Sequence, residues 1–299
     1  MRIGCSAGYV FGRFGPDATY QDYVTSIKRV AELGFVSLEL EIFNKGQWDV
    51  YTDARIKTIK ELFFSLGLEC PVFFAEVVKE DLLSVNAGRR RKGIEAFRRV
   101  VDICKRLKVV DTVGISGGAP AELVVEYLKT YPGAPPSELV LPEGYSWRNV
   151  WNGYVESIRR CVKIAKDAGM RFAVEARPGS LTSNTDSYLV LDREINSKNF
   201  GIIFDPTQLF YQKEPLAVSI EKLDKKIFVV HISDNDGTKL YHWPPGKGKI
   251  DWEVVLRTLH KIGFKGILDL ELYGEGVTGN TDKCFLEGKR YLERIISKL

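Results

Sequence analysis

The sequence predicts an α/β protein that folds as a single (β/α)8 TIM barrel. Short runs of apolar and β-branched residues alternate with longer segments of helical period along the whole chain, which is the pattern of parallel β/α units. The strand candidates number eight, and a length of 299 residues suits a barrel, which typically needs about 250. We therefore expect one barrel domain over residues 1–299.

The expected strands and helices alternate in order along the chain. The strands are predicted at 2–7, 36–43, 68–74, 109–115, 171–175, 200–204, 227–233 and 266–271. The helices are predicted at 21–33, 53–66, 90–107, 147–168, 187–194, 216–223, 251–262 and 281–299. Gly34, Gly67 and Gly169 each follow the end of one of these helical patterns, as glycine often does at a helix C-terminus.

A doubly wound open sheet is the competing fold. Such a sheet normally carries a glycine-rich phosphate turn after its first strand, and residues 4–15 contain no G-x-G-x-x-G, so we favour the barrel. Residues 117–145 contain five prolines and form an expected loop insertion with a short helix at 121–129. Long loops of this kind either serve binding at the barrel mouth or are tolerated surface insertions, and the sequence leaves both open.

Composition and charge favour a soluble cytoplasmic protein. With 43 basic and 39 acidic residues interspersed, the only dense basic cluster is 89–92, which we interpret as a helix start, so no nucleic-acid partner is expected. Five cysteines without a C-x-x-C pair argue against a disulfide framework and fit a reducing compartment. No apolar run approaches the roughly 18 residues of a membrane span, and the N-terminus lacks a signal-peptide h-region, so no membrane partner is expected.

Four potential metal ligands stand at or near the ends of four consecutive predicted strands. They are Glu175, Asp205, His231 and Glu271. Because the carboxyl ends of barrel strands share one face, these side chains should converge. Each acid alone is most simply a strand-end residue that caps a helix or meets a lysine. Three buried acids together need a common counter-charge, and a divalent metal ion supplies it.

The same region resembles a known family. FDPTQLFYQ at 204–212 is similar to the F-D-P-S-H-L-x-W-Q pattern of xylose-isomerase-like sugar phosphate isomerases and epimerases. VEARPG at 174–179 resembles their E-x-H-P-G, and VVHISD at 229–234 resembles H-V-H-x-K-D. WPPGKGKIDW at 243–252 resembles L-P-G-x-G-x-I-D-W. The family is related to D-tagatose 3-epimerase and to AP endonuclease family 2.

The resemblance implies an isomerase with one bound metal ion. Glu175, Asp205, His231 and Glu271 would hold it, with Mn²⁺ expected first and Mg²⁺, Co²⁺ or Zn²⁺ as alternatives. Glu175 and Glu271 would be the catalytic pair that moves a proton next to a carbonyl, through an enediolate. The same site can also run as a lyase or dehydratase on an inositol or keto-sugar derivative, and the chain can instead be a partner-dependent subunit of such an enzyme.

Two residues depart from the family pattern. Arg177 and Gln208 stand where the family often has histidine. Arg177 suits a carboxylate, a phosphate or a developing oxyanion, and Gln208 suits a sugar hydroxyl, so both are candidate substrate ligands. The alternatives are that Arg177 pairs with a neighbouring acid and that Gln208 only packs.

Other candidate substrate ligands come from three places in the chain. Asp234 follows the strand of His231, although such a sequence also suits a turn. His242 belongs to a Pro/Gly-rich segment that can close over a substrate. Glu39, like Glu41 and Glu76, ends an early strand and lines the pocket or has a structural part.

The expected partner is a small sugar or polyol. A DNA-repair endonuclease shares the fold, but its trinuclear zinc cluster needs many histidines and this chain has three. The resemblance also makes a homodimer or homotetramer plausible.

Overall fold

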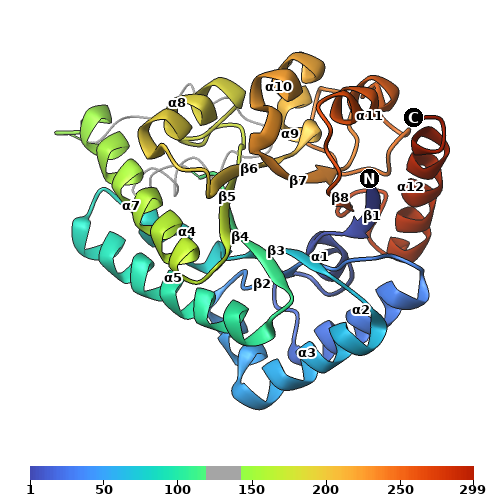
Figure 1. Cartoon of the computed structure of the whole chain (residues 1–299), viewed down its shortest axis with the longest axis horizontal. Coiled ribbons are helices and arrows are strands. Elements are labelled where there is room, and N and C mark those ends of the chain that lie inside the picture. The colour runs from blue at the N-terminus through green and yellow to red at the C-terminus, as the bar shows by residue number, and fades with distance from the viewer. Residues whose placement is uncertain (119–142) are drawn as a thin grey trace.

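The computed structural model describes residues 1–118 and 143–299 and shows eight parallel strands surrounded by helices (Figure 1). The strands are β1 Arg2–Cys5, β2 Leu40–Glu41, β3 Cys70–Phe74, β4 Val110–Ser116, β5 Arg171–Glu175, β6 Phe200–Phe204, β7 Ile227–Ile232 and β8 Ile267–Leu270. Neighbours are hydrogen-bonded in the order β1-β8-β7-β6-β5-β4-β3-β2. The expected α/β barrel class is confirmed.

Backbone hydrogen bonds between β1 and the segment before β2 close the ring. The Cys5 N–H donates to the Ser37 carbonyl at 3.0 Å, and the Glu39 N–H donates to the Cys5 carbonyl at 3.0 Å. The strand expected at 36–43 is correspondingly short, because only Leu40–Glu41 pairs regularly with β3. The residues before it make isolated bridges, Cys5↔Leu38 on one side and Ser37↔Glu69 on the other.

Helices form the outer layer. They are α1 Gly8–Phe14, α2 Tyr20–Glu32, α3 Asp53–Leu66, α4 Lys79–Leu82, α5 Ala87–Leu107, α7 Trp147–Asp167, α8 Thr185–Ile195, α9 Pro206–Tyr211, α10 Leu216–Leu223, α11 Trp252–Lys261 and α12 Thr281–Ile296, with 3-10 turns η1 Lys45–Tyr51, η2 Glu76–Val78 and η4 Asp224–Lys226. The eight expected helices are present, and the basic cluster 89–92 lies in the first turns of α5. The helix expected at 121–129 falls outside the described residues.

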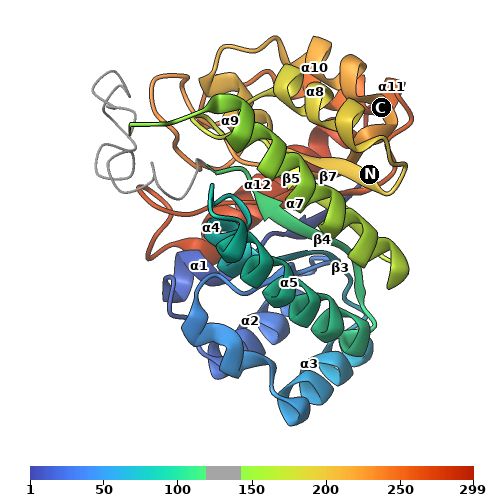
Figure 2. The same ribbon diagram turned by 90° about the vertical axis from the view of Figure 1, so that its left-hand side faces the viewer.

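The long helices α5 and α7 lie side by side along one flank of the barrel (Figure 2). The Ser146 side chain accepts the Asn149 N–H and so caps the start of α7. Its buried stripe includes Tyr154, Ile158 and Cys161, which recur at helical spacing. Burying an isoleucine or tyrosine of this kind stabilises the fold by about 1.5–3 kcal/mol.

A second, smaller core fills the barrel interior. It consists of Val72, Phe74, Ala173, Ile203 and Val229, with Phe228 packed against it. The Arg171 guanidinium covers the Phe228 ring at 4.2 Å. A Cβ at Gly201 would lie 2.5 Å from that ring, so glycine leaves the space that Phe228 fills. Because these residues pack the interior, the polar side chains that converge on one another lie at the C-terminal ends of the strands.

All five cysteines are buried and free, as the absence of a C-x-x-C pair led us to expect. Within the two described ranges, no helix combines the length and the apolar character needed to cross a membrane.

Candidate metal centre

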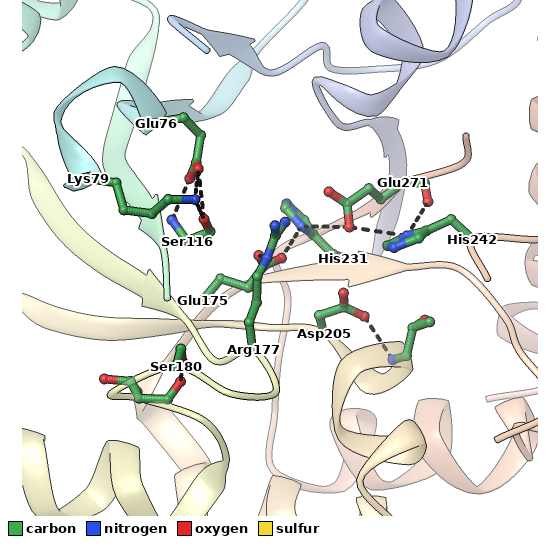
Figure 3. A network of polar contacts seen from close by, with 12 residues as sticks. Glu76, Lys79, Ser116, Glu175, Arg177, Ser180, Asp205, His231, His242 and Glu271 are labelled. Atoms are coloured by element: carbon green, nitrogen blue, oxygen red, sulfur yellow. Dashed lines mark hydrogen bonds and ion pairs between the residues drawn. The ribbon is translucent and has the colours of Figure 1, made fainter. Parts of the chain in front are cut away.

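Four predicted ligands meet at the C-terminal ends of four neighbouring strands (Figure 3). Glu175 is the last residue of β5, Asp205 follows β6, His231 lies in β7 and Glu271 follows β8. All four side chains are buried. The chain folds this way because each carboxylate or imidazole stands at or near the end of a largely buried strand that runs toward the same mouth.

Three of these side chains have the spacing of a metal site. One ligand atom from each of Glu175, His231 and Glu271 lies within 4.8 Å of the others. His231 Nδ1 lies 3.0 Å from Glu175 Oε1 and 3.5 Å from Glu271 Oε2. The two glutamates therefore flank one imidazole nitrogen.

Asp205 lies beside this group but does not join it at that spacing. Its Oδ1 accepts the Thr207 N–H at 2.8 Å and caps α9. Among the described residues, its buried Oδ2 has no hydrogen-bond partner, and the same holds for Glu271 Oε2. Burial, with the charges of Glu271 and Glu175, raises the pKa of Asp205 to about 8. Unpartnered carboxylate oxygens beside an imidazole nitrogen fit a divalent cation, which satisfies and neutralises them.

Glu39 contacts Nε2 of His231, the ring nitrogen that is not beside Glu175 and Glu271. Its two carboxylate oxygens lie 3.1 and 3.2 Å from His231 Nε2, and one of them accepts the Ala7 N–H at 3.4 Å. An Nε2–H that donates to Glu39 leaves the Nδ1 lone pair directed at Glu175 and Glu271, which is the arrangement of a metal-binding histidine. The structure thus places Glu39 against His231, where we had expected a possible substrate ligand.

Arg177 pairs with Glu175. Its Nε donates to Glu175 Oε2 at 2.5 Å. Burial alone would raise the pKa of Glu175, but the Arg177 charge and the bond with His231 lower that pKa to about 2. The Arg177 side chain stays 31% exposed, and its two terminal nitrogens make no hydrogen bond to any part of the chain that the structure describes. They remain available to a ligand.

Gln208 lies on α9, one turn after Asp205, and is buried. Its Oε1 has no hydrogen-bond partner within residues 1–118 and 143–299, so packing in this part of the chain does not explain the side chain.

His242 lies beside Glu271 and is held there by several contacts. It is buried, its ring stacks on Tyr273 at 4.0 Å, and its Nε2 accepts the Tyr273 hydroxyl at 2.9 Å. Its Nδ1 lies 3.0 Å from Ser233 Oγ and 3.2 Å from the Glu271 carbonyl oxygen. Burial lowers the pKa of His242, so the ring is held neutral. Tyr273 was not expected, although it lies two residues after Glu271.

Asp234 is turned away from the other predicted ligands. Its carboxylate accepts the N–H groups of Gly246 and Ile250 at 2.8 and 3.2 Å and the Trp252 indole N–H at 3.1 Å. A Cβ at Gly248 would lie 2.3 Å from Asp234 Oδ1, so only glycine fits there. These bonds anchor the loop of the P-G-x-G-x-I-D-W motif, and substrate binding by Asp234 stays a prediction.

Two further acids of the mouth have different surroundings. Glu76 accepts the Ser116 N–H at 2.7 Å, the Ser116 hydroxyl at 2.8 Å and the Lys79 ammonium at 2.5 Å, which ties β3 to β4. Glu41 ends β2 and is 7% exposed. Burial, with the charges of Glu76 and Glu271, raises the pKa of Glu41 to about 8.

The fold and this ligand set define a class of protein. The model of the xylose isomerase-like TIM barrel family matches residues 27–295. The chain therefore belongs to the xylose isomerase-like TIM barrel family.

Relatives of the chain include named epimerases and isomerases. An uncharacterised protein of Methanocaldococcus jannaschii is 32% identical over 149 residues, which cover 45% of this chain and half the length of that protein. A D-psicose 3-epimerase of Ruminiclostridium cellulolyticum is 22% identical over 84% of this chain and 78% of its own. An inosose isomerase of Bacillus licheniformis is 25% identical over 61% of each chain.

Solved structures share the fold. A D-tagatose 3-epimerase-like protein superposes with a TM-score of 0.77 at 23% identity, over 100% of this chain and 98% of the other. The IOLI protein, solved with a bound zinc atom, gives a TM-score of 0.73 at 18% identity, over 100% of this chain and 99% of the other.

Proposed function

We propose that this protein is a divalent-metal-dependent sugar or sugar phosphate isomerase or epimerase. It acts by removing a proton from a carbon next to a carbonyl. The observation that carries the proposal is the pair of buried glutamates, Glu175 and Glu271, on either side of His231 Nδ1. The names of the relatives, psicose epimerase and inosose isomerase, support a carbonyl sugar or polyol as the substrate.

The four predicted ligands would hold the cation, and we propose Mn²⁺ first. Zn²⁺ is the alternative, because a structural relative was solved with a bound zinc atom. When bound, a divalent cation supplies positive charge that stabilises the oxyanion formed as the neighbouring C–H loses its proton.

The protein's own residues carry the proton. Arg177 orients Glu175 and keeps it ionised, so Glu175 stands in the deprotonated form that a general base needs. Glu271, backed by the neutral His242, serves the opposite face of the substrate. A proton removed by one glutamate and one returned by the other invert the carbon, which is epimerisation. A proton returned to the adjacent carbon interconverts ketose and aldose.

A second candidate function is a dehydratase on an inositol or keto-sugar derivative. Glu271 supports it, because a carboxyl group that has taken the proton from the carbon can return it to a departing hydroxyl, which then leaves as water.

Deuterium wash-in from D₂O, followed by NMR with Mn²⁺ present, tests the proposal. The panel contains free and phosphorylated ketoses, aldoses and inososes. We expect deuterium at a carbon next to the carbonyl of at least one compound. Loss of water from a compound would favour the dehydratase, and absence of exchange throughout would contradict both functions.

A further inference from the structure

Glu41 is a buried acid of the barrel mouth that the proposed chemistry does not use. It lies two residues after Glu39 on the same strand, so both side chains point to the barrel interior. Both carboxylate oxygens of Glu39 contact His231 Nε2. The Glu41 carboxylate makes no hydrogen bond or ion pair with any residue in 1–118 or 143–299, although 93% of the residue is buried.

The backbone fixes Glu41 in this position. Its carbonyl oxygen accepts the Tyr51 hydroxyl at 2.9 Å and the Tyr23 hydroxyl at 3.3 Å. The next residue, Ile42, donates its N–H to the Phe74 carbonyl at 2.9 Å. The strand end is therefore held from the helical layer and from β3. These bonds fix the backbone from which the Glu41 side chain extends.

Within the described residues, no side chain hydrogen-bonds the Glu41 carboxylate. Glu76 already accepts from Ser116 and Lys79, and Arg177 gives its Nε to Glu175 and acts on Glu41 only through its charge. Burying a carboxyl group without a partner costs several kcal/mol of folding free energy. A leucine at this position would avoid that cost. A fixed, unpartnered acceptor in a ligand-binding mouth is preorganised for a donor that comes from outside the chain.

Resting on the proposed function, we propose that Glu41 is a specificity-determining substrate ligand: it accepts a hydrogen bond from a hydroxyl group of the sugar that lies outside the metal centre. The carboxylates of Glu39, Glu76 and Glu271 together outweigh the opposing charge of Arg177 at Glu41, which favours a neutral hydroxyl over a phosphate or carboxylate at this position. The reacting carbon stays with Glu175 and Glu271.

Calorimetric titration of the Mn²⁺-loaded protein tests this role. The probes are D-fructose, D-psicose and D-tagatose, with the singly deoxygenated forms of the one that binds most tightly. We expect the wild type to bind one deoxy form about 10- to 100-fold more weakly than the parent sugar. Glu41→Ala should bind the parent more weakly by a similar factor and bind that deoxy form as the wild type does. Glu80→Ala, at an exposed position of α4, is the matched control and should bind like the wild type.

The thermal stability of Glu41 variants distinguishes a substrate-binding role of Glu41 from a structural role. Because Glu41 has no partner within the described chain, Glu41→Ala and Glu41→Gln should melt at or above the wild-type temperature. A lower melting temperature with unchanged sugar discrimination would make Glu41 structural and overturn the inference.

The inference and the proposed function can fail separately. Deuterium exchange in a Glu41→Ala protein that still discriminates the deoxy forms leaves the function standing and overturns the role of Glu41. Glu41-dependent binding without exchange in the wild type overturns the function and supports the role. If no sugar binds the wild type, the role of Glu41 is overturned as well.

Discussion

At the residue scale, the two glutamates beside His231 carry the proposed chemistry. Glu271→Gln keeps the size of the side chain but replaces a base with a neutral amide. We expect turnover to fall by about 10³-fold, because general acid–base groups contribute about 10²–10⁴-fold. The rate of deuterium exchange checks this, and the melting temperature should stay near that of the wild type. Glu293→Gln on α12 is a suitable control. Full activity in the Glu271 variant would rule out this mechanism.

We propose that Glu39 positions His231 for the metal. Glu39→Gln weakens the hold on His231 Nε2, so we expect the Mn²⁺ affinity to fall by roughly 10- to 100-fold. At saturating Mn²⁺ the variant should regain most of its exchange activity, because Glu39 does not touch the substrate in this account. Metal titration followed by the exchange assay measures both effects. A loss of activity that saturating metal does not rescue would assign Glu39 a direct part in the chemistry.

The four proposed ligands could be selected from the sequence because each stands at or near the end of a clear apolar strand. The sequence did not distinguish Asp234 from a substrate ligand, since only the fold shows that residues 243–252 return to its carboxylate. Nor did the sequence show that Glu39, Glu41 and Glu76 have different surroundings, because all three stand near the ends of early predicted strands. Their partners, His231 for Glu39 and Ser116 for Glu76, come from distant units of the barrel.

At the scale of elements, Asp234 holds the loop that leads from β7 to α11. Asp234→Ala removes the acceptor of three N–H groups and leaves buried donors unpaired, so we expect a loss of about 3 kcal/mol in the free energy of unfolding. Urea denaturation measures it. Asp236→Ala is the control, because that carboxylate bonds within its own turn at Thr238. Equal stability of the two variants would contradict an anchoring role.

Asp282 ties α12 to the first two helices. It accepts from Tyr9 at 2.6 Å, Arg29 at 2.7 Å and Arg13 at 2.8 Å. Burial alone would raise the pKa of Asp282, but the Tyr9 and Arg29 bonds and the arginine charges lower it. A lowered folded-state pKa stabilises the protein above the unfolded value of about 4, and this contribution is lost as the pH falls through the folded pKa.

We therefore expect Asp282→Asn to melt below the wild type at pH 7 and the gap to narrow below about pH 4. Melting temperatures from pH 2.5 to 7 test this, with the exposed Asp102→Asn as the control. A gap that is constant with pH would show that the charge of Asp282 is not what stabilises the packing.

Among the elements, the long amphipathic helices were the most predictable. α3 has the expected bounds, because its apolar period and the C-terminal Gly67 agree. The short α1 and α9 were not expected: seven and six residues are too few for a periodic pattern, and α9 owes its start to the Asp205 cap and to Pro206. The second strand was predicted too long because residues 36–39 pair only through isolated bridges, one to Cys5 of β1 and one to Glu69 before β3.

At the scale of the whole molecule, eight alternating units predicted the barrel, and its closure rests on contacts far apart in sequence. β1 must pair with β8 and with residues 36–39 at once. The inner core, against which Phe228 packs, fills the barrel interior, and polar groups occupy the mouth. Residues 119–142, where we expected a loop insertion, fall outside the described chain.

The central claim is that one divalent cation binds between the ends of β5, β6, β7 and β8. A crystal structure of the protein with Mn²⁺, with anomalous data collected at the manganese edge, tests it most directly. We predict one peak per chain, bonded by His231 Nδ1 and by carboxylate oxygens of Glu175, Asp205 and Glu271. Manganese bound elsewhere, or none at this position at saturating Mn²⁺, would contradict the account.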